Sequence, residues 1–229
     1  MSAALQAIVF DFDGVIANSE PLHLTAFQQA LEEEGIDLTS AEYFSSYLGY
    51  DDVGMFAALA RDRGLPMSAE KIASLVARKS QTMQTMLRTG TVLFPGAKEF
   101  ICEAAAVVPI AIASGALRHE IDEIVEAAGV GGLFSAIVAA GDTRESKPSP
   151  APYRLAFRRL RETTGLDLDP RRCVAIEDSH WGLESAMGAG LRCVGVTSSY
   201  PAHALQGAEL VVDSLKELTL PALDRLCRR

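Results

Sequence analysis

The sequence predicts an α/β fold: a doubly wound, Rossmann-like parallel-sheet core with a small α-helical domain inserted after the first strand. Short apolar runs that resemble strands alternate with longer segments of helical periodicity along most of the chain. Most of these runs are continuously apolar, as expected for strands buried on both faces of a parallel sheet. Only the stretch from Ser19 to about Arg88 breaks the alternation, because its patterns are all helical.

The core elements follow in order along the chain. Helices are predicted over residues 96–106, 118–128, 150–164 and 179–189, each beside an apolar run. Open α/β sheets bind ligands at the carboxyl ends of their strands. The predicted strands are Ala7–Phe10, Ile110–Ala113, Ala136–Ala139, Cys173–Ile176, Cys193–Val196 and Leu210–Val212.

The inserted stretch predicts a helical bundle. Ser19 followed by Pro21 is typical of a helix N-cap and an early-helix proline. The turn residues Phe94-Pro95-Gly96 mark the return to the core. We therefore predict a discontinuous core of residues 1–16 and 95–229 and a helical cap of residues 17–94, joined by two crossings that can act as a hinge. The positions at helical spacing are Leu24, Phe27, Leu31, Met55, Phe56, Leu59, Ala60, Ile72, Leu75, Val76 and, continuing the same spacing, Lys79.

Composition narrows the class of protein. The 229 residues are 48% hydrophobic and 22% charged, which is typical of a globular chain with a large core. A net charge of −9 without a long basic run argues against a nucleic-acid partner. The apolar segment Ala104–Ala113 is interrupted by Pro109 and is about half the ~20 residues of a membrane span. No signal peptide or CxxC pair is evident, so we expect a cytoplasmic protein with reduced thiols and no membrane partner.

Four polar motifs each follow a predicted strand or its loop. They are Asp11-Phe12-Asp13-Gly14, Ser114-Gly115, Lys147-Pro148 and Glu177-Asp178-Ser179. Each motif alone has an ordinary interpretation: an Asx-rich turn, a helix N-cap, a solvated lysine, and acids at a helix start. Because parallel strands end at one edge of a sheet, we expect all four to converge there. Together they would supply a nucleophile, an acid, a hydroxyl, a cation and oxygen ligands for a metal.

In this order, the motifs resemble those of the haloacid dehalogenase (HAD) superfamily. The segment from Asp11 to Glu20 is similar to the β-phosphoglucomutase-like and phosphoglycolate-phosphatase-like branch, and the helical insert resembles the cap of that branch. The resemblance runs from Ala7 to about Val212. It implies a phosphohydrolase that uses Mg²⁺ and an aspartyl-phosphate intermediate to release phosphate from a small phosphorylated metabolite.

The resemblance also implies roles for the acids. Asp11 would attack phosphorus, and Asp13 would serve as general acid and base. Mg²⁺ would be held by Asp11, by the backbone carbonyl of Asp13 and by Asp178. Glu177 would act as a further ligand or through a bound water. The second aspartate argues against a dehalogenase, which lacks it in this superfamily.

The remaining candidate residues would bind the substrate. Ser114 and the backbone of Gly115 would hold a phosphoryl oxygen, and Lys147 would neutralise charge on the phosphoryl group and on Asp11. Gly14 would let the chain turn sharply beneath the phosphate. The further candidates for substrate binding are His23, which has a helix-surface position as its alternative, together with Lys79 and Arg118.

Two other functions remain open. A β-phosphoglucomutase-like enzyme would need a cap cation for a second phosphate. The cap loop Gly49-Tyr50-Asp51-Asp52-Val53 instead carries acids where the mutases have an arginine, so a phosphatase is favoured. A non-catalytic binding protein would be expected to have lost one of the motif residues, and none is missing. The oligomeric state is open, with a monomer as the simpler expectation.

Overall fold

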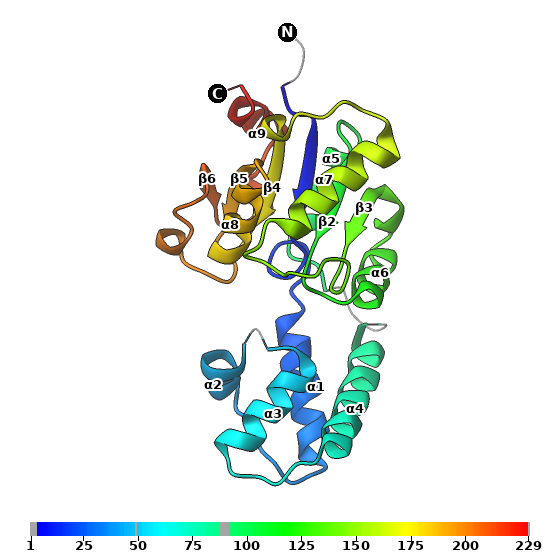
Figure 1. The fold of residues 1–229 in the computed structure, drawn as a ribbon, viewed down its shortest axis with the longest axis vertical. Coiled ribbons are helices and arrows are strands. Elements are labelled where there is room, and N and C mark those ends of the chain that lie inside the picture. Colours follow the sequence, from blue (N-terminus) through cyan, green and yellow to red (C-terminus); the bar gives the residue numbers. More distant parts are fainter. Residues whose placement is uncertain (1–3, 49, 88–91, 229) are drawn as a thin grey trace. The chain divides into compact units, whose positions relative to one another are not determined.

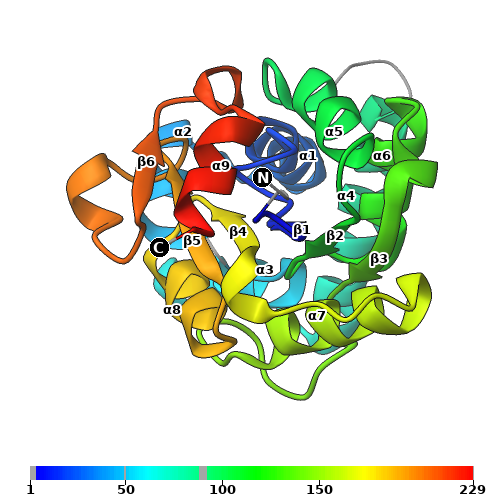
Figure 2. The same cartoon turned by 90° about the horizontal axis from the view of Figure 1, so that it is seen from above.

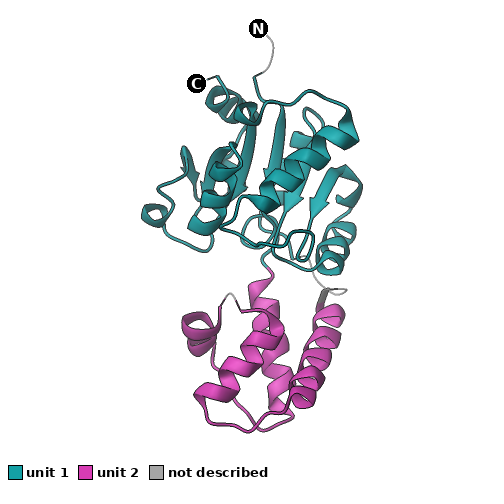
Figure 3. Ribbon diagram, viewed as in Figure 1, with its two compact units in different colours: residues 1–18, 91–229 teal, residues 19–90 magenta. Residues whose placement is uncertain are grey.

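The computed structural model describes residues 4–48, 50–87 and 92–228. The chain forms two compact units, coloured separately in Figure 3: unit 1 is residues 1–18 and 91–229, and unit 2 is residues 19–90. The sequence had placed these boundaries after residue 16 and before residue 95. The difference arises because the two crossings pair with each other inside unit 1. The Asn18 backbone N–H donates to the Val92 carbonyl at 2.7 Å, and Ala17 forms an antiparallel bridge with Leu93.

Unit 1 is built on a parallel sheet (Figure 1). Neighbouring strands run parallel in the order β3-β2-β1-β4-β5-β6. The order reverses direction between β1 and β4, which is the switch point where open α/β sheets bind ligands. The predicted doubly wound fold is confirmed. In the described part of the chain the strands are β1 (Ala7–Phe10), β2 (Ile110–Ala113), β3 (Phe134–Val138), β4 (Cys173–Glu177), β5 (Arg192–Val196) and β6 (Leu210–Val212).

Helices cover both faces of the sheet (Figure 2). On one face lie α7 (Ala151–Thr164) and α8 (His180–Gly188), and on the other lie α5 (Ala97–Ala105), α6 (Arg118–Ala127) and α9 (Leu220–Leu226). The first four core helices along the chain coincide with the predicted ones apart from their terminal residues, whereas α9 was not predicted. Short 3₁₀ turns occur at Gly131–Leu133, Pro170–Arg172, Ala202–Ala204 and Leu215–Glu217.

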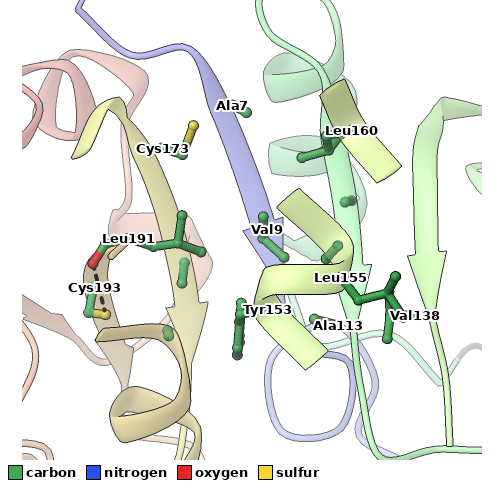
Figure 4. Packing of buried hydrophobic residues seen from close by; sticks show 14 of the residues in the cluster. Ala7, Val9, Ala113, Val138, Tyr153, Leu155, Leu160, Cys173, Leu191 and Cys193 are labelled. Carbon is green, nitrogen blue, oxygen red and sulfur yellow. Dashed lines mark hydrogen bonds between the residues drawn. The ribbon is translucent and has the colours of Figure 1, made fainter. Parts of the chain in front are cut away.

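Side chains of β1 alternate between the two layers of helices. Ala7 and Val9 join a buried cluster that includes Tyr153 of α7 (Figure 4). Phe10 instead packs edge-on against Phe100 of α5, with ring centroids 6.1 Å apart. All four residues of β1 are 0% exposed. The strand is therefore buried on both faces, which explains why its sequence is continuously apolar.

The third strand begins earlier than predicted, at Phe134 rather than Ala136. Phe134 pairs with Ile110 of β2, and its ring packs edge-on against Phe10 at a centroid distance of 6.3 Å. An edge strand carries a weaker apolar signal than a central one, because part of it faces solvent. The cross-strand aromatic contact is a tertiary interaction that the local pattern does not contain.

Unit 2 is helical over its described residues. Its elements are α1 (Glu20–Glu32), α2 (Ser40–Glu42), a π-helical turn (Tyr43–Tyr47), α3 (Asp52–Asp62) and α4 (Ala69–Leu87). Residues from all of these elements except α2 pack into one core, in which Phe27 lies edge-on to Phe56 at a centroid distance of 5.3 Å. The core includes the predicted periodic positions Leu24, Phe27, Leu31, Met55, Phe56, Leu59 and Leu75.

Ser19 precedes α1 as predicted, but its side chain makes no capping hydrogen bond. Its backbone is already helical, with φ −80° and ψ −25°. An N-cap side chain reaches back to the helix only when the cap residue is extended. Pro21 does lie in the first turn, as expected.

The longest described helix, α4, has 19 residues and mixes charged with apolar side chains. Its inner face contributes Leu75 to the core, and Lys79 is buried on the same helix. Among the described residues, no helix is long and apolar enough to cross a lipid bilayer.

Candidate active site

The four motifs lie at one edge of the sheet of unit 1. The Asp11 backbone N–H donates to the Ile176 carbonyl, and the Ser114 N–H donates to the Val138 carbonyl, both at 2.9 Å. The backbone hydrogen bonds of the sheet therefore extend to Asp11 and Ser114, the first residues of these two motifs. Glu177 ends β4, and Lys147 lies in the loop between β3 and α7. This is the edge at which parallel strands present their carboxyl ends.

Lys147 joins two of these motifs directly. Its Nζ lies 2.7 Å from Asp11 Oδ1 and 2.6 Å from Glu177 Oε1. The lysine side chain is 15% exposed and that of Glu177 is 0% exposed. Lys147 thus has two carboxylates as partners rather than bulk water, so the solvated-lysine interpretation does not describe it.

The cluster has more negative than positive charge. Burial, and then the charge of Glu177, raises the pKa of Asp11 well above its usual value. The same two causes, in the same order, raise the pKa of Asp178 to about 7. Burial alone would lower the pKa of Lys147, but the charges of Asp11 and Glu177 outweigh it and raise that pKa. Lys147 therefore stays protonated, and its single positive charge is shared between Asp11 and Glu177.

A divalent cation would fit this group of acids. Asp11, Glu177 and Asp178 each offer a carboxylate oxygen, and these atoms lie within 4.8 Å of one another. Hard cations prefer oxygen ligands of this kind. A cation here would offset the repulsion that raises the pKa values of Asp11 and Asp178. The acidic cluster is thus compatible with metal binding.

Glu177 is held by donors on both of its oxygens. Oε1 accepts from Lys147 and, at 2.8 Å, from the hydroxyl of Tyr153. Oε2 accepts from the Ser179 hydroxyl at 3.1 Å. Sequence reasoning missed Tyr153, because an aromatic residue on the inner face of a helix usually belongs to the core. The available signal is that a buried tyrosine hydroxyl needs a polar partner.

Gly14 makes a turn that only glycine fits. Its φ is +79°, and a Cβ built there would lie 1.8 Å from Asp178 Oδ2. The glycine therefore lets the first motif approach the fourth one closely. Asp13, the residue before it, is partly exposed, and its charge adds to the effects of burial and Glu177 on the pKa of Asp178.

Ser114 is 5% exposed and does not cap the following helix. Its Oγ accepts from the Ala116 N–H at 2.9 Å, and the N-cap of α6 is Leu117. The helix-cap alternative for Ser114 is therefore wrong. Gly115 has open space around its Cα, with no atom within 4 Å of a built Cβ. The end of β2 thus presents a hydroxyl and an accessible backbone segment.

Arg118 has a different neighbourhood from the other candidates in unit 1. Its guanidinium pairs with Asp122 at 2.9 Å, and the side chain is 58% exposed. It lines a polar pocket of about 440 Å³ between α6, β3 and α7, together with Glu126, Asp142 and Arg159. No other predicted site residue lines this pocket. Substrate binding by Arg118 stays a prediction.

The two cap candidates contact each other within unit 2. Lys79 Nζ lies 2.8 Å from His23 Nδ1 and 2.8 Å from Asp52 Oδ1. Lys79 is 1% exposed and also lies 5.0 Å from the centroid of the Phe27 ring. Asp51 caps α3 by accepting from the Gly54 N–H. Both acids of the predicted cap loop therefore have partners within unit 2, while Gly49 lies outside the described residues. Substrate binding by His23 and Lys79 stays a prediction.

Comparison with known proteins independently supports the family resemblance of the four motifs. Residues 8–196 match the model of the haloacid dehalogenase-like hydrolases. The protein CbbY of Rhodobacter capsulatus is 35% identical over 205 residues, which cover 86% of this chain and 87% of that protein. A phosphoglycolate phosphatase of Pectobacterium atrosepticum is 25% identical over 219 residues, with 94% and 91% of the two chains covered.

Solved structures of one further relative show the same fold. CbbY of Rhodobacter sphaeroides in complex with phosphate has a TM-score of 0.82 and 31% identity, covering 96% of this chain and 99% of that one. A mutant of that protein in complex with xylulose-(1,5)bisphosphate has a TM-score of 0.79 and 32% identity, with 93% and 96% covered. This chain therefore belongs to the haloacid dehalogenase-like hydrolase family, as its four motifs predicted.

Proposed function

We propose that the chain is a Mg²⁺-dependent phosphatase that hydrolyses small phosphomonoesters through an aspartyl phosphate on Asp11. The observation that carries this proposal is the buried cluster in which Lys147 bridges Asp11 and Glu177 beside Asp178. It combines a carboxylate nucleophile, a fixed cation and oxygen ligands for a metal at the switch point of the sheet. The phosphatase among the relatives supports the same reaction class.

Asp11 is oriented for attack by one of its two oxygens. Both Lys147 Nζ and the Phe12 N–H approach Oδ1, each at 2.7 Å. We assign the other oxygen, Oδ2, to attack on phosphorus. The new O–P bond forms as the bond from phosphorus to the leaving oxygen breaks, and Asp13 donates a proton to that oxygen. A water then attacks phosphorus and gives a proton to Asp13, and breaking the O–P bond regenerates Asp11 and releases phosphate.

The surrounding groups would manage the charge. Mg²⁺ would be held by the carboxylates of Asp11 and Asp178 and by the Asp13 backbone carbonyl, where it reduces the repulsion between an anionic nucleophile and an anionic phosphoryl group. Lys147 carries a positive charge next to Asp11 throughout. Ser114 Oγ and the backbone N–H of Gly115 would donate to phosphoryl oxygens. Glu177 orients Lys147 and borders the metal site.

A sugar phosphate is the substrate class we assign first. The relative that is 32% identical binds xylulose-(1,5)bisphosphate, and a further relative is a phosphoglycolate phosphatase. Within unit 2, the buried cation Lys79 is already paired with Asp52. If that pair persists during turnover, monophosphates of a sugar should be hydrolysed at least as well as its bisphosphate, because no unpaired Lys79 charge is present to hold a second phosphate.

The test is release of inorganic phosphate in the presence of Mg²⁺. The substrates are xylulose-(1,5)bisphosphate, the matched monophosphates of the same sugar, phosphoglycolate and β-glucose 1-phosphate with a trace of its 1,6-bisphosphate. We expect phosphate release from at least one ester, release at least about 10³-fold slower in Asp11→Asn, and undiminished release by Asp167→Asn, an acid whose side chain is 98% exposed. Glucose 6-phosphate formed without free phosphate would establish the mutase instead. Full activity with Ca²⁺ in place of Mg²⁺ would contradict the proposed metal site, because Ca²⁺ takes more ligands in looser geometry.

A further inference from the structure

The loop that follows β5 contacts both motifs that border the acidic cluster. The Ser198 hydroxyl donates a hydrogen bond to the Gly14 carbonyl. The hydroxyl of the next residue, Ser199, lies beside the Asp178 carboxylate, since both border the position that a Cβ on Gly14 would take. These two serines lie far along the chain from the first motif, and no local pattern in the sequence marks them. The loop therefore connects β5 to the site through side chains rather than through strand pairing.

The three groups meet in a crowded place. A Cβ built on Gly14 would lie 1.8 Å from Asp178 Oδ2 and 2.9 Å from Ser199 Oγ. The Gly14 backbone, the Asp178 carboxylate and the Ser199 hydroxyl thus surround a space too small for a methyl group. Asp178 is 5% exposed, so water has little access with which to replace a lost donor.

The Asp178 carboxylate needs such a restraint. One of its oxygens lies within 4.8 Å of carboxylate oxygens of Glu177 and Asp11, and these like charges repel it. Without a donor, rotation about its side-chain bonds would move the carboxylate away from Glu177 and from the position shared with Asp11. Hydrogen-bond donors to a metal-binding carboxylate fix its orientation before the metal binds, and the loss of such a donor usually weakens metal affinity.

We propose that Ser199 is a positioning residue that holds the Asp178 carboxylate in the orientation that binds a divalent cation, while Ser198 fixes the Gly14 turn beside it. This inference rests on the proposed function, because the cation is the one assigned there. The two serines act on separate motifs from a single loop. The loop thereby couples the end of β5 to the geometry of the metal site.

The test measures metal binding without substrate. Mn²⁺ serves as the probe, because free Mn²⁺ is counted directly by electron paramagnetic resonance, and Mg²⁺ is then titrated as a competitor. We expect Ser199→Ala to raise the dissociation constant for Mn²⁺ by about 10-fold to 100-fold. Ser199 itself is exposed, so the loss of its hydroxyl should lower the melting temperature of the metal-free variant by no more than a few degrees. Ser199→Thr, which keeps the hydroxyl, should restore most of the affinity.

Thr197→Val is the matched control. Thr197 lies in the same loop, but its hydroxyl donates to Asp213 at 2.8 Å rather than to either motif. We expect this variant to bind Mn²⁺ like the wild type. An equal loss in Thr197→Val and Ser199→Ala would show a general effect of the loop and overturn the proposal.

The two proposals fail in different ways. If the wild type binds Mn²⁺ and Ser199→Ala binds it equally well, the positioning role is wrong and the proposed function stands. If the wild type binds neither Mn²⁺ nor Mg²⁺, the metal-dependent phosphatase is wrong, and the role of Ser199 falls with it.

Discussion

Each unit buries a lysine, but the two lysines have unlike partners. In unit 1, Lys147 contacts the carboxylates of Asp11 and Glu177, and the cluster of acids extends to a third carboxylate. In unit 2, Lys79 contacts the single carboxylate of Asp52 and the ring nitrogen of His23. The first cluster is short of positive charge, whereas the second is close to balanced.

The pKa shifts follow this difference. Burial and like charges raise the pKa values of Asp11 and Asp178. Burial, and then the charge of Lys79, lowers the pKa of His23 to about 3, so its imidazole stays neutral and its Nδ1 accepts from Lys79. A buried cluster with excess charge is incomplete until an ion binds, whereas a balanced one can be complete as folded. We therefore expect metal to act on unit 1 and to leave unit 2 unchanged.

The largest expected effect comes from removing the nucleophile. Asp11→Asn should lower the rate of phosphate release by about 10³-fold or more, because an amide cannot form the aspartyl phosphate. Its melting temperature without Mg²⁺ should stay within a few degrees of the wild type, since the change also relieves repulsion from Glu177. Rate assays and thermal unfolding of the two proteins check both points. Turnover near the wild-type rate would refute the assignment of Asp11.

Replacing each lysine by methionine compares the clusters directly. Lys147→Met leaves buried carboxylates without their cation and should cost about 3–5 kcal/mol of unfolding free energy. Lys79→Met should cost about 1–2 kcal/mol, because the Asp52 side chain is 25% exposed and gains water. Denaturant unfolding without metal measures both. Mg²⁺ should restore stability only to Lys147→Met, and equal recovery of the two variants would remove the distinction between the clusters.

The two clusters should respond to pH in opposite ways. Raising the pH should destabilise the cluster of unit 1, and lowering the pH should destabilise the cluster of unit 2. The raised pKa of Asp178 favours the folded state below about pH 4, and this contribution is lost as the pH rises through about 7. The lowered pKa of His23 favours the folded state above about pH 6.5, and its contribution is lost as the pH falls toward about 3. Scanning calorimetry across this range, with and without Mg²⁺, reads out both effects.

Mg²⁺ and one substitution separate these contributions. At 100 times its dissociation constant, Mg²⁺ should add about 2.7 kcal/mol at pH 8 and less at pH 5, where protons compete for the carboxylates. His23→Gln keeps an acceptor for Lys79 but cannot titrate, so it should reduce the acid sensitivity alone. A gain from Mg²⁺ that does not depend on pH would argue against carboxylates with raised pKa values as its ligands.

A small expected effect tests how Glu177 is held. Tyr153→Phe removes one donor to Glu177 Oε1 but leaves Lys147 on the same oxygen. We expect a loss of about 1–2 kcal/mol in unfolding free energy and a modest fall in phosphate release. Denaturant unfolding at pH 7 measures the first, and rate assays measure the second. A loss as large as that of Lys147→Met would mean that the hydroxyl, rather than the ammonium group, is the main partner of Glu177.

Local pattern was sufficient for most of the elements, because each buried strand is a continuous apolar run. It was insufficient where contacts between distant residues decide the outcome. Phe134 joins β3 through its pairing with Ile110 and its contact with Phe10. Ser19 does not cap α1, since its backbone is helical rather than extended. The helix after β6 carries too short an apolar pattern to be recognised alone.

The acids of the site were recognisable because each motif follows a strand of a parallel sheet. Their supporting groups were not, because a hydroxyl carries no sign in the sequence of which distant acceptor it will meet. Tyr153 reaches Glu177, and Ser198 reaches Gly14 across most of the chain. In unit 2 the sequence presented the acids of the cap loop and the candidate Lys79 as separate features, whereas the structure pairs Asp52 with Lys79.

The sequence by itself therefore determined the family, the doubly wound core with its helical insert, and the convergence of four motifs at one edge of the sheet. The family follows from the resemblance of the four motifs, and the core and the convergence follow from periodicity and from the geometry of parallel strands, which are set locally. Only the tertiary structure decided the charge balance of each cluster and the donors that hold each acid. Those depend on distances between residues far apart in the chain, because Coulomb energy and hydrogen bonding respond to separation and burial rather than to order in the sequence.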